Sequence, residues 1–559
     1  MFFEAHRARL DRAVQAIDAR EYWSPYPESP SPSIYGEDAA KTGEAAFQAL
    51  LNNRFELDQP GTGDYTGQET SPYGLELGIT YPHSDPAALV EAASAALPGW
   101  RDAGPQARAG VALEILKRIN ERSFELAHAV SHTSGQHFVM AFQAGGPHAQ
   151  DRALEAIAYA YAESTRQPTR ATWEKPQRKG DPLRMDKKFT VVPRGIGLVI
   201  GCNTFPTWNS YPGLFASLVT GNPVIVKPHP RAILPLAITV SIAREVLAEA
   251  GFDKNVVTLA VEAPGELIAG DLATNPAVKI VDFTGSTEYG DWLEANARQA
   301  VVYTEKAGLN TVIVDSTDDY KGLLRNLGFS LSLYSGQMCT TPQNILVPRD
   351  GIDTDQGRKT PAEFAADLAS GVDKLLSDPA RAVGTLGALA NPGVVDRLAK
   401  AHELGEVVLA SRAVEVDGLP KATVRTPVIV ALDAKDEDTY TTEWFGPISF
   451  VISTDSTEHA LDIFRRTVSA HGALTASVYS TSENVLSDTE LAALEAGVHL
   501  SENLTQGVFV NQSAAFSDFH GTGANPAAST ALTDPGFVTG RFYVLQSRRH
   551  APVEGAEVG

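Results

Sequence analysis

Cysteine is almost absent from this chain, because the 559 residues contain only Cys202 and Cys339. Two cysteines are too few for a disulfide framework in a chain of this length, and they cannot supply the paired Cys-x-x-Cys ligands of a metal cluster. The cysteine content therefore excludes a disulfide-stabilised scaffold and favours the cell interior as the compartment.

Basic residues are outnumbered by acidic ones, with 46 Lys and Arg against 68 Asp and Glu and a net charge of -22 at pH 7. Such a chain repels nucleic acid and anionic membrane surfaces unless its basic residues are concentrated in one patch. The densest basic stretch, Arg178 to Lys188, is interrupted by Asp181 and Asp186. We therefore expect neither nucleic acid nor a membrane as a partner.

The sequence also lacks an apolar run that is typical of an export signal or a membrane span. Residues 1–20 carry charges throughout, and the uncharged stretch Gly195 to Val226 contains Pro206, Pro212 and Pro223. Prolines at these positions would break a membrane helix and leave backbone polar groups without partners in lipid. A buried strand, turn and helix fits this stretch better, and we expect a cytoplasmic protein.

What the chain does contain is the composition of a folded enzyme or binding protein, with 43% apolar and 20% charged residues. From about residue 190, short apolar runs alternate with helical segments, which is typical of βαβ units in a parallel sheet of the dinucleotide-binding type. A second such series extends from about Thr311 to Leu500. The apolar runs of the first series are Ile196 to Ile200, Val224 to Val226, Val256 to Ala260 and Ile280 to Phe283.

Gly285 and Ser286 follow the last of these runs and open a helical segment. Ser286 can cap that helix, and the free backbone N–H groups of its first turn can face an anion such as a pyrophosphate. An ordinary capped turn remains the alternative for this motif taken by itself.

Three further residues are candidates for catalysis. Cys339 lies in a polar, glycine-containing loop, where nucleophiles are common, whereas Cys202 lies in an apolar segment and is interpreted as a packing residue. Glu305 closes an apolar run, so it is either a general base with a raised pKa or a solvated charge. Asn203 follows a predicted strand and can donate to an oxyanion or stabilise a turn.

Five motifs follow one another along the chain: Asn203 with Lys227-Pro228, Phe283-Thr284-Gly285-Ser286-Thr287, Glu305, Gly336-Gln337-Met338-Cys339 and Glu443-Trp444-Phe445-Gly446-Pro447. Taken in this order, they resemble the aldehyde dehydrogenase superfamily, and the resemblance extends from about residue 60 to the C-terminus. The segment Glu21 to Glu28 is in addition similar to the phenylacetate-degradation enzymes of PaaN type within that superfamily.

The resemblance implies a role for each residue. Cys339 would attack the aldehyde carbonyl, Asn203 and the Cys339 backbone N–H would hold the oxyanion, and Glu305 would activate the water that hydrolyses the thioester. The cofactor residues would be Lys227 at the adenosine ribose, Gly285 and Ser286 at the pyrophosphate, and Glu443 with Phe445 at the nicotinamide ribose.

Two departures from the family pattern bear on the cofactor and on the base. Many members continue the lysine motif as Lys-Pro-Ser-Glu, but here it continues with His229 and Pro230. Without the acid, a 2′-phosphate meets no repulsion and Arg231 or His229 can contact it, so we favour NADP, with NAD possible. Ala307 replaces a glycine two residues after Glu305, which puts its methyl close to the predicted base.

The implied reaction oxidises an aldehyde to a carboxylic acid, and the resemblance suggests a coenzyme A-linked semialdehyde of phenylacetate catabolism as the substrate. Two other activities stay open at this point, acyl transfer to coenzyme A and ring-opening hydrolysis without redox chemistry. A non-catalytic scaffold is a further alternative, although it gives no reason to keep Cys339, Glu305 and Asn203 together.

The expected architecture is an aldehyde dehydrogenase-like α/β fold, with a Rossmann-type cofactor domain, a second α/β catalytic domain and a β-hairpin oligomerisation arm. Exposed strands in the arm would pair with a second copy in a homodimer or homotetramer. The expected boundaries are 1–60 for an N-terminal extension, 61–163 and 190–304 for the cofactor domain, 305–498 for the catalytic domain, 499–529 for a return to the cofactor domain, and 164–189 with 530–559 for the arm.

His128 and His132 lie four residues apart on a predicted helix, with His137 just beyond. Such a pair can bind a metal, but no acidic third ligand accompanies it as in the His-Glu-x-x-His motif. We therefore interpret the pair as a solvated or capping helix face and expect no metal.

Overall fold

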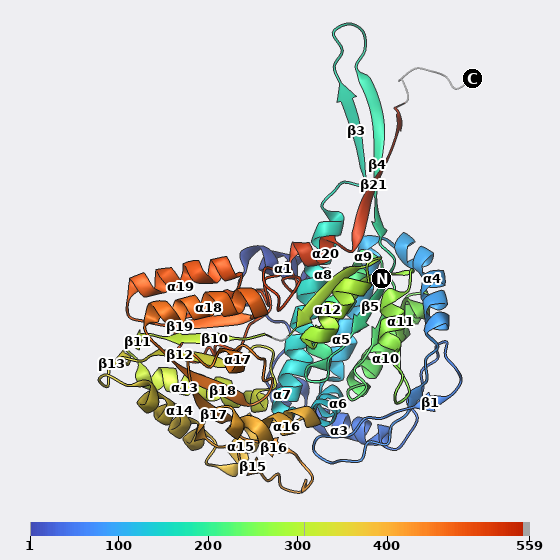
Figure 1. The fold of residues 1–559 in the computed structure, drawn as a ribbon. Coiled ribbons are helices and arrows are strands. Elements are labelled where there is room, and N and C mark those ends of the chain that lie inside the picture. Colours follow the sequence, from blue (N-terminus) through green and yellow to red (C-terminus); the bar gives the residue numbers. More distant parts are fainter. Residues whose placement is uncertain (1, 307, 552–559) are drawn as a thin grey trace, which may run out of the picture.

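The structure, a computed structural model, describes residues 2–306 and 308–551 (Figure 1). Ala307, which the sequence places beside the predicted base, and residues 552–559 of the predicted arm lie outside the described ranges. The chain forms two α/β lobes, and a narrow three-stranded arm projects from one of them (Figure 1). No helix within the described ranges is both long enough and apolar enough to cross a membrane.

The first lobe is built on five parallel strands in the order β7-β6-β5-β8-β9. The chain runs outward from β5 to β7 and then returns to β8 and β9 on the other side of β5. The carboxyl ends of β5 and β8 therefore flank a switch point, where open α/β sheets bind their ligands. The strands are β5 Ile196–Ile200, β6 Val224–Lys227, β7 Val257–Leu259, β8 Val278–Gly285 and β9 Val301–Lys306.

Helices cover both faces of this sheet because successive strand residues point to opposite sides. In β5, Leu198 belongs to a core that includes residues of α4, α11 and α12, whereas Val199 belongs to a core that includes residues of α5, α8, α9 and α10. The strand, turn and helix predicted between Gly195 and Val226 are confirmed by β5, α9 and β6. The helices of this lobe are α4 Pro86–Asp102, α5 Gly104–Glu121, α6 Ser123–Ser134, α7 Phe138–Gln143, α8 Ala149–Thr165, α9 Pro206–Thr220, α10 Leu234–Glu249, α11 Ile268–Thr274 and α12 Thr287–Asn296.

The second lobe is built on a seven-stranded sheet in the order β14-β17-β18-β12-β10-β19-β20, parallel except at β14. Val312 and Ile313 of β10 enter separate cores on its two faces. Its strands are β10 Thr311–Val314, β12 Asn344–Pro348, β14 Glu406–Leu409, β17 Val428–Asp433, β18 Ile448–Thr454, β19 Thr475–Tyr479 and β20 His499–Glu502, and its main helices are α13 Tyr320–Ser332, α14 Pro361–Leu375, α16 Pro392–Lys400, α18 Thr457–His471 and α19 Glu483–Ala496.

The first 60 residues pack onto the first lobe. Helix α1 (Phe2–Ala19) buries Leu10, and α3 (Ala39–Leu50) buries Phe47. The rings of His128 and His132 stack on Phe47 at centroid distances of 5.5 and 5.3 Å, and burial lowers the pKa of His132 to about 4. The prediction of a solvated histidine face is therefore wrong, because α3 covers these rings.

The arm consists of β3 (Arg170–Lys175), β4 (Leu183–Pro193) and β21 (Phe542–His550), which pair antiparallel in the order β21-β4-β3. The structure thus pairs the two segments that the sequence analysis expected to form exposed strands. Leu183, Val544 and Leu545 expose apolar side chains on this arm.

Candidate active site

Four of the predicted site residues lie at the carboxyl ends of parallel strands in the first lobe. Lys227 ends β6, Gly285 ends β8, and Glu305 lies beside Thr284 near the end of β9. Ser286 follows as the N-cap of α12, and its side chain accepts a hydrogen bond from the Tyr289 backbone N–H at 3.4 Å. The predicted cap is confirmed, and the N-terminus of α12 follows β8 at the ligand-binding edge of the sheet.

Cys339 lies in the second lobe, in the loop between α13 and β12. Three consecutive residues before it, Tyr334, Ser335 and Gly336, have left-handed φ angles of 54°, 50° and 65°. Non-glycine residues rarely adopt this conformation, and such strain persists only where surrounding contacts hold the backbone.

Those contacts come from the rest of the molecule. The Tyr334 hydroxyl donates to the Ser134 carbonyl of α6. The Gln337 side chain donates to the Ala388 carbonyl at 3.0 Å and accepts from the Ala390 N–H at 2.9 Å. The loop that carries Cys339 is therefore fixed to both lobes.

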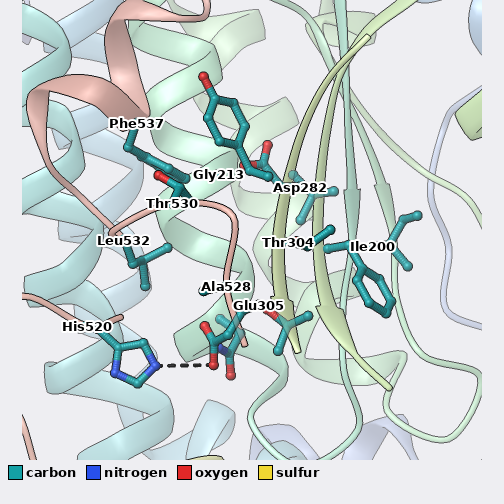
Figure 2. Close-up of a pocket in the computed structure, with 15 residues that line it drawn as sticks. Ile200, Gly213, Asp282, Thr304, Glu305, His520, Ala528, Thr530, Leu532 and Phe537 are labelled. Atoms are coloured by element: carbon teal, nitrogen blue, oxygen red, sulfur yellow. Dashed lines mark hydrogen bonds and ion pairs between the residues drawn. The ribbon is translucent and has the colours of Figure 1, made fainter. Parts of the chain in front are cut away.

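Folding brings Cys339 and Glu305 together with a residue that the sequence analysis did not single out, His520. One ligand atom from each of the three side chains lies within 4.8 Å of the other two. His520 Nε2 is 3.2 Å from Glu305 Oε1 and 3.8 Å from Cys339 Sγ, and the Asn209 amide donates to Glu305 Oε2 at 3.0 Å. Figure 2 shows the His520 ring facing the Glu305 carboxylate.

The pKa values of Glu305 and Cys339 are shifted in opposite directions, although both groups are buried. Burial alone would raise the pKa of Glu305, but the facing His520 and hydrogen bonds from Cys339 and Asn209 hold this pKa below its usual value. Burial raises the pKa of the Cys339 thiol well above its usual value, and the Glu305 carboxylate adds to this effect. Glu305 is therefore a buried carboxylate that is ionised at neutral pH, so the raised pKa expected from the sequence is wrong, as is the alternative of a solvated charge. The thiol needs a proton acceptor to become a nucleophile.

Asn203 is buried and follows β5. Its amide nitrogen donates to the Thr133 carbonyl at 3.0 Å, and its side-chain oxygen is buried without a partner. Within the described residues, no hydrogen bond joins Asn203 to Cys339, Glu305 or His520. An amide group has two N–H donors, so the bond to Thr133 leaves one of them available.

Cys339 and His520 lie in the wall of a cavity of about 260 Å³. Helices α7 and α9 and the end of α13 supply much of this wall. Its apolar lining includes Val139, Met140, Phe205, Trp208, Phe329 and Leu333. The thiol is thus accessible from a largely apolar chamber.

A smaller space of about 20 Å³ also borders Cys339 and is lined by Asn310, Glu443 and Phe445. Burial raises the pKa of Glu443 to about 7, and the nearby Arg397 opposes this shift. The structure therefore brings the predicted residues Glu443 and Phe445 close to Cys339. Neither residue lines the large cavity.

Lys227 meets a carboxylate that the sequence analysis did not find. Its ammonium group is 2.5 Å from Glu262 Oε1, and both side chains are buried. Glu262 follows β7, and its second oxygen accepts from the Ile268 N–H at 3.2 Å, at the start of α11. No sequence signal links Glu262 to Lys227, because Lys227 ends β6 whereas Glu262 follows β7.

His229 and Arg231 are placed differently from the sequence expectation. His229 Nδ1 accepts from the Arg231 backbone N–H at 3.1 Å, and burial lowers the pKa of His229 to about 4. The Arg231 guanidinium donates to Asn391 at 3.5 Å. At neutral pH, His229 therefore offers no positive charge to a phosphate.

His520 reaches the site through the return segment between β20 and α20 (Pro535–Thr539). Residues of this segment pair with β9, where the Ala527 carbonyl accepts from Lys306 N–H and the Ser529 N–H donates to the Thr304 carbonyl at 3.0 Å. The Leu532 N–H in turn donates to the His520 carbonyl at 3.0 Å. The sequence offered one indication of this residue, namely that a histidine lies inside the predicted return segment 499–529.

The site fits a dinucleotide on three observations of the chain itself. The strand order reverses between β5 and β8, the capped N-terminus of α12 follows β8, and the Lys227–Glu262 pair supplies a hydrogen-bond donor and acceptor at the ends of the neighbouring strands β6 and β7. These are the groups that bind pyrophosphate and ribose hydroxyls in open α/β sheets.

Comparison with known proteins agrees with this geometry. A crystal structure of an NAD-dependent aldehyde dehydrogenase from Burkholderia multivorans is 58% identical, covers 99% of this chain and 100% of that chain, and superposes with a TM-score of 0.98. A 1-pyrroline-5-carboxylate dehydrogenase structure, 21% identical, covers 95% of this chain and 99% of that chain with a TM-score of 0.74, and supports the fold alone.

Curated relatives match over shorter segments. An alpha-ketoglutaric semialdehyde dehydrogenase 2 from Azospirillum brasilense is 34% identical over 198 residues, which are 34% of this chain and 37% of that protein. A lactaldehyde dehydrogenase from Methanococcus maripaludis is 25% identical over 248 residues, 44% of this chain and 50% of that protein. The chain thus spans half or less of the length of these relatives. The model of the aldehyde dehydrogenase family matches residues 71–513, most of the sequence, and the chain belongs to this family.

Proposed function

We propose that the protein oxidises an aldehyde to a carboxylic acid, with a nicotinamide dinucleotide as hydride acceptor and Cys339 as the nucleophile. The observation that carries the proposal is the meeting of Cys339, Glu305 and His520 within 4.8 Å, in the wall of an apolar cavity and beside the ligand-binding edge of a dinucleotide-type sheet. Family membership supports the same reaction.

The first half of the reaction is assigned to Cys339 and Asn203. The Cys339 thiolate adds to the aldehyde carbonyl, and the oxyanion accepts hydrogen bonds from the Cys339 backbone N–H and from the second amide N–H of Asn203. The bond from Asn203 to Thr133 fixes the amide for this purpose. A bound dinucleotide supplies the acceptor for the hydride, and an acyl thioester remains on Cys339.

Glu305 is assigned to the second half, hydrolysis of the thioester. Its carboxylate is oriented by Asn209 and His520 and keeps lone pairs that can take a proton from a water molecule. An ionised base beside the thioester favours water over coenzyme A as the acyl acceptor. A requirement for free coenzyme A in product formation would instead establish acyl transfer, and consumption of substrate without cofactor reduction would establish a non-redox hydrolase.

For the cofactor we propose NAD rather than NADP. The absence of an acid after Lys227-Pro228 favoured NADP at the level of sequence, but Glu262 provides a carboxylate against the Lys227 ammonium. If Lys227 binds the adenosine ribose, a 2′-phosphate at that ribose meets the negative charge of Glu262. The name of the NAD-dependent Burkholderia enzyme agrees with this assignment.

The cofactor proposal predicts a change in selectivity for Glu262→Gln. This variant keeps the shape and an acceptor oxygen but removes the charge, so the ratio of kcat/KM for NAD to that for NADP should fall by about tenfold or more, as expected for about 1.4 kcal/mol of repulsion. Glu266→Gln, which changes an exposed acid in the same loop, is the matched control. A wild-type enzyme that prefers NADP would overturn the assignment.

The cavity limits the substrate. A cavity of about 150 Å³ accommodates benzene, so the 260 Å³ chamber accommodates a larger apolar group. Among its described lining residues there is no lysine or arginine to bind a phosphate or carboxylate. We propose a medium-sized apolar aldehyde. A coenzyme A-linked semialdehyde of phenylacetate catabolism, suggested by the PaaN-type resemblance, would keep its nucleotide outside the chamber.

We further propose a homo-oligomer located in the cytoplasm. The arm exposes Leu183, Tyr543, Val544 and Leu545 on a strand pair with an open edge, a surface that another copy can cover. Light scattering should give a dimer or tetramer for the wild type. A variant with charged residues at Val544 and Leu545 should give a monomer, and a monomeric wild type would exclude the proposal.

The experiment that tests the proposed function compares the two thiols. Cys339→Ser should abolish aldehyde-dependent cofactor reduction, whereas Cys202→Ser, which changes a thiol near the same cavity, should keep most of it. The assay follows absorbance of the reduced cofactor with aldehydes of increasing length, including acyl-coenzyme A semialdehydes. Wild-type rates in Cys339→Ser would overturn the proposal.

A further inference from the structure

We propose that His520 is the catalytic base that removes the proton from the Cys339 thiol, so that Cys339, His520 and Glu305 act as a cysteine–histidine–carboxylate triad. This inference rests on the proposed role of Cys339 as nucleophile and adds a residue to it. It concerns the step before the aldehyde is attacked, which neither Asn203 nor the cofactor residues can perform.

One ring nitrogen of His520 lies near both the Cys339 thiol and the Glu305 carboxyl group. His520 Nε2 lies 3.8 Å from Cys339 Sγ and 3.2 Å from Glu305 Oε1. The ring is 5% exposed and makes an edge contact with Trp208 at a centroid distance of 4.7 Å. His520 is therefore held in position to take a proton from the thiol on Nε2, and only then can the new Nε2–H donate to the carboxylate.

Electrostatics favours the imidazole over Glu305 as the acceptor of the thiol proton. Glu305 is the weaker acceptor because its Oε2 already accepts a hydrogen bond from the Asn209 amide at 3.0 Å and its Oε1 faces His520. If the proton moved to Glu305, the thiolate would face a neutral ring. If it moves to His520, an imidazolium lies between a thiolate and a carboxylate and attracts both, in a buried setting where such attraction is strong.

The other charged and titratable groups near His520 do not replace it. The Cys202 thiol is itself an acid whose pKa burial raises to about 11. The Arg152 guanidinium has no acceptor atom, and it lies 5.5 Å from the centroid of the Trp208 ring that contacts His520. Among the described residues that face the Cys339 thiol, His520 is thus the one whose imidazole nitrogen can accept the proton.

The protons balance over the catalytic cycle. The Sγ–H bond breaks and a bond from Nε2 to the proton forms, while Nδ1 keeps its own hydrogen and the ring becomes an imidazolium that donates to Glu305. The thiolate then forms the bond to the carbonyl carbon. When water attacks the thioester, Glu305 takes the water proton, the C–S bond breaks, and His520 returns its proton to Sγ. Glu305 finally releases one proton to solvent for each aldehyde oxidised.

The test measures the thiol directly, without aldehyde or cofactor. Wild-type and His520→Gln proteins are treated with iodoacetamide at pH 7, and alkylation of the Cys339 peptide is followed by mass spectrometry, with the Cys202 peptide as internal standard. EDTA is present throughout, because a thiolate, an imidazole and a carboxylate are also zinc ligands. We expect alkylation of Cys339 to slow by about tenfold or more, since the thiolate fraction falls tenfold for each unit of thiol pKa.

His499→Gln is the matched control. His499 Nε2 bonds to the Gly521 carbonyl at 2.8 Å, so this variant removes an imidazole that contacts the residue after His520 but not Cys339. Its alkylation rate should stay within about twofold of wild type, the spread expected of surface-like changes. Equal rates in wild type and His520→Gln, or equal slowing in both variants, would overturn the proposal.

The pH dependence of alkylation provides a second measurement. The rate at Cys339 should rise at a lower pH in wild type than in His520→Gln, and identical pH profiles in the two proteins would also overturn the proposal. Aldehyde-dependent cofactor reduction is measured in the same preparations. If His520→Gln protein still reduces the cofactor and its Cys339 is alkylated at the wild-type rate, the role of His520 is refuted and the proposed function stands. If wild-type Cys339 is alkylated fast but no cofactor is reduced, the proposed function is refuted and the role of His520 stands.

Discussion

Replacing Glu305 by glutamine separates the two halves of the proposed reaction. The glutamine side chain has the shape of the carboxylate and keeps one acceptor oxygen for a bond from Asn209 or His520. The cavity and the position of Cys339 should therefore be preserved. What Glu305→Gln loses is the proton acceptor for the hydrolytic water, while formation of the thioester does not require that acceptor.

The magnitude follows from the role of a general base. Such a group contributes about 10² to 10⁴ in rate, which corresponds to about 3 to 5 kcal/mol at 1.36 kcal/mol for each factor of ten. Rapid mixing of Glu305→Gln with aldehyde and NAD should thus give a burst of one reduced cofactor for each active site, followed by a steady rate lower than that of wild type by about 10² to 10⁴.

Glu249→Gln serves as a control, because this exposed acid pairs with Arg118 at the surface. Its burst and steady rates should match those of wild type. Unchanged steady turnover in Glu305→Gln would remove Glu305 from the mechanism. Loss of the burst together with turnover would mean that Glu305 is needed before the thioester forms, and the division of roles between Glu305 and His520 would be refuted.

Two further predictions concern stability and pH. The fully buried Arg541 guanidinium lies 2.5 Å from an Asp282 oxygen, and Asp282→Asn removes this counter-ion. The free energy of unfolding measured in urea should therefore fall by about 3 to 5 kcal/mol. A change below about 1 kcal/mol would contradict this prediction. Glu443 has its pKa raised to about 7, so it becomes a carboxylate, the form that accepts bonds from ribose hydroxyls, as pH rises through 7. The KM for NAD should therefore be lower at pH 8 than at pH 6 in wild type and independent of pH in Glu443→Gln, and an unchanged pH dependence in the variant would exclude Glu443 from cofactor binding.

Sequence patterns were sufficient to predict the elements that are set locally. The uncharged stretch from Gly195 to Val226 could be assigned as strand, turn and helix because a buried parallel strand is continuously apolar and a proline suits the start of a helix. The cap by Ser286 was predictable for the same reason, since a serine between a strand and a helix offers its hydroxyl to the first helical turn.

Contacts between distant segments were not predictable in this way. His520 lies 215 residues from Glu305, in a segment without helical or strand periodicity, and its position depends on pairing of that segment with β9. Glu262 pairs with Lys227 only because β6 and β7 are neighbours in the sheet. The histidine face of α6 was misassigned for a similar reason, because Phe47, the residue that covers it, is about 80 positions away along the chain.

The most direct measurement of the central claim is the mass of the covalent intermediate. Glu305→Gln protein is mixed with an apolar aldehyde and NAD, quenched in acid and digested, and the two cysteine peptides are weighed. The proposed reaction predicts an acyl group on the Cys339 peptide, formed only when NAD is present, and an unmodified Cys202 peptide. Cofactor reduction with no acyl group on Cys339, or with the acyl group on Cys202, would contradict it.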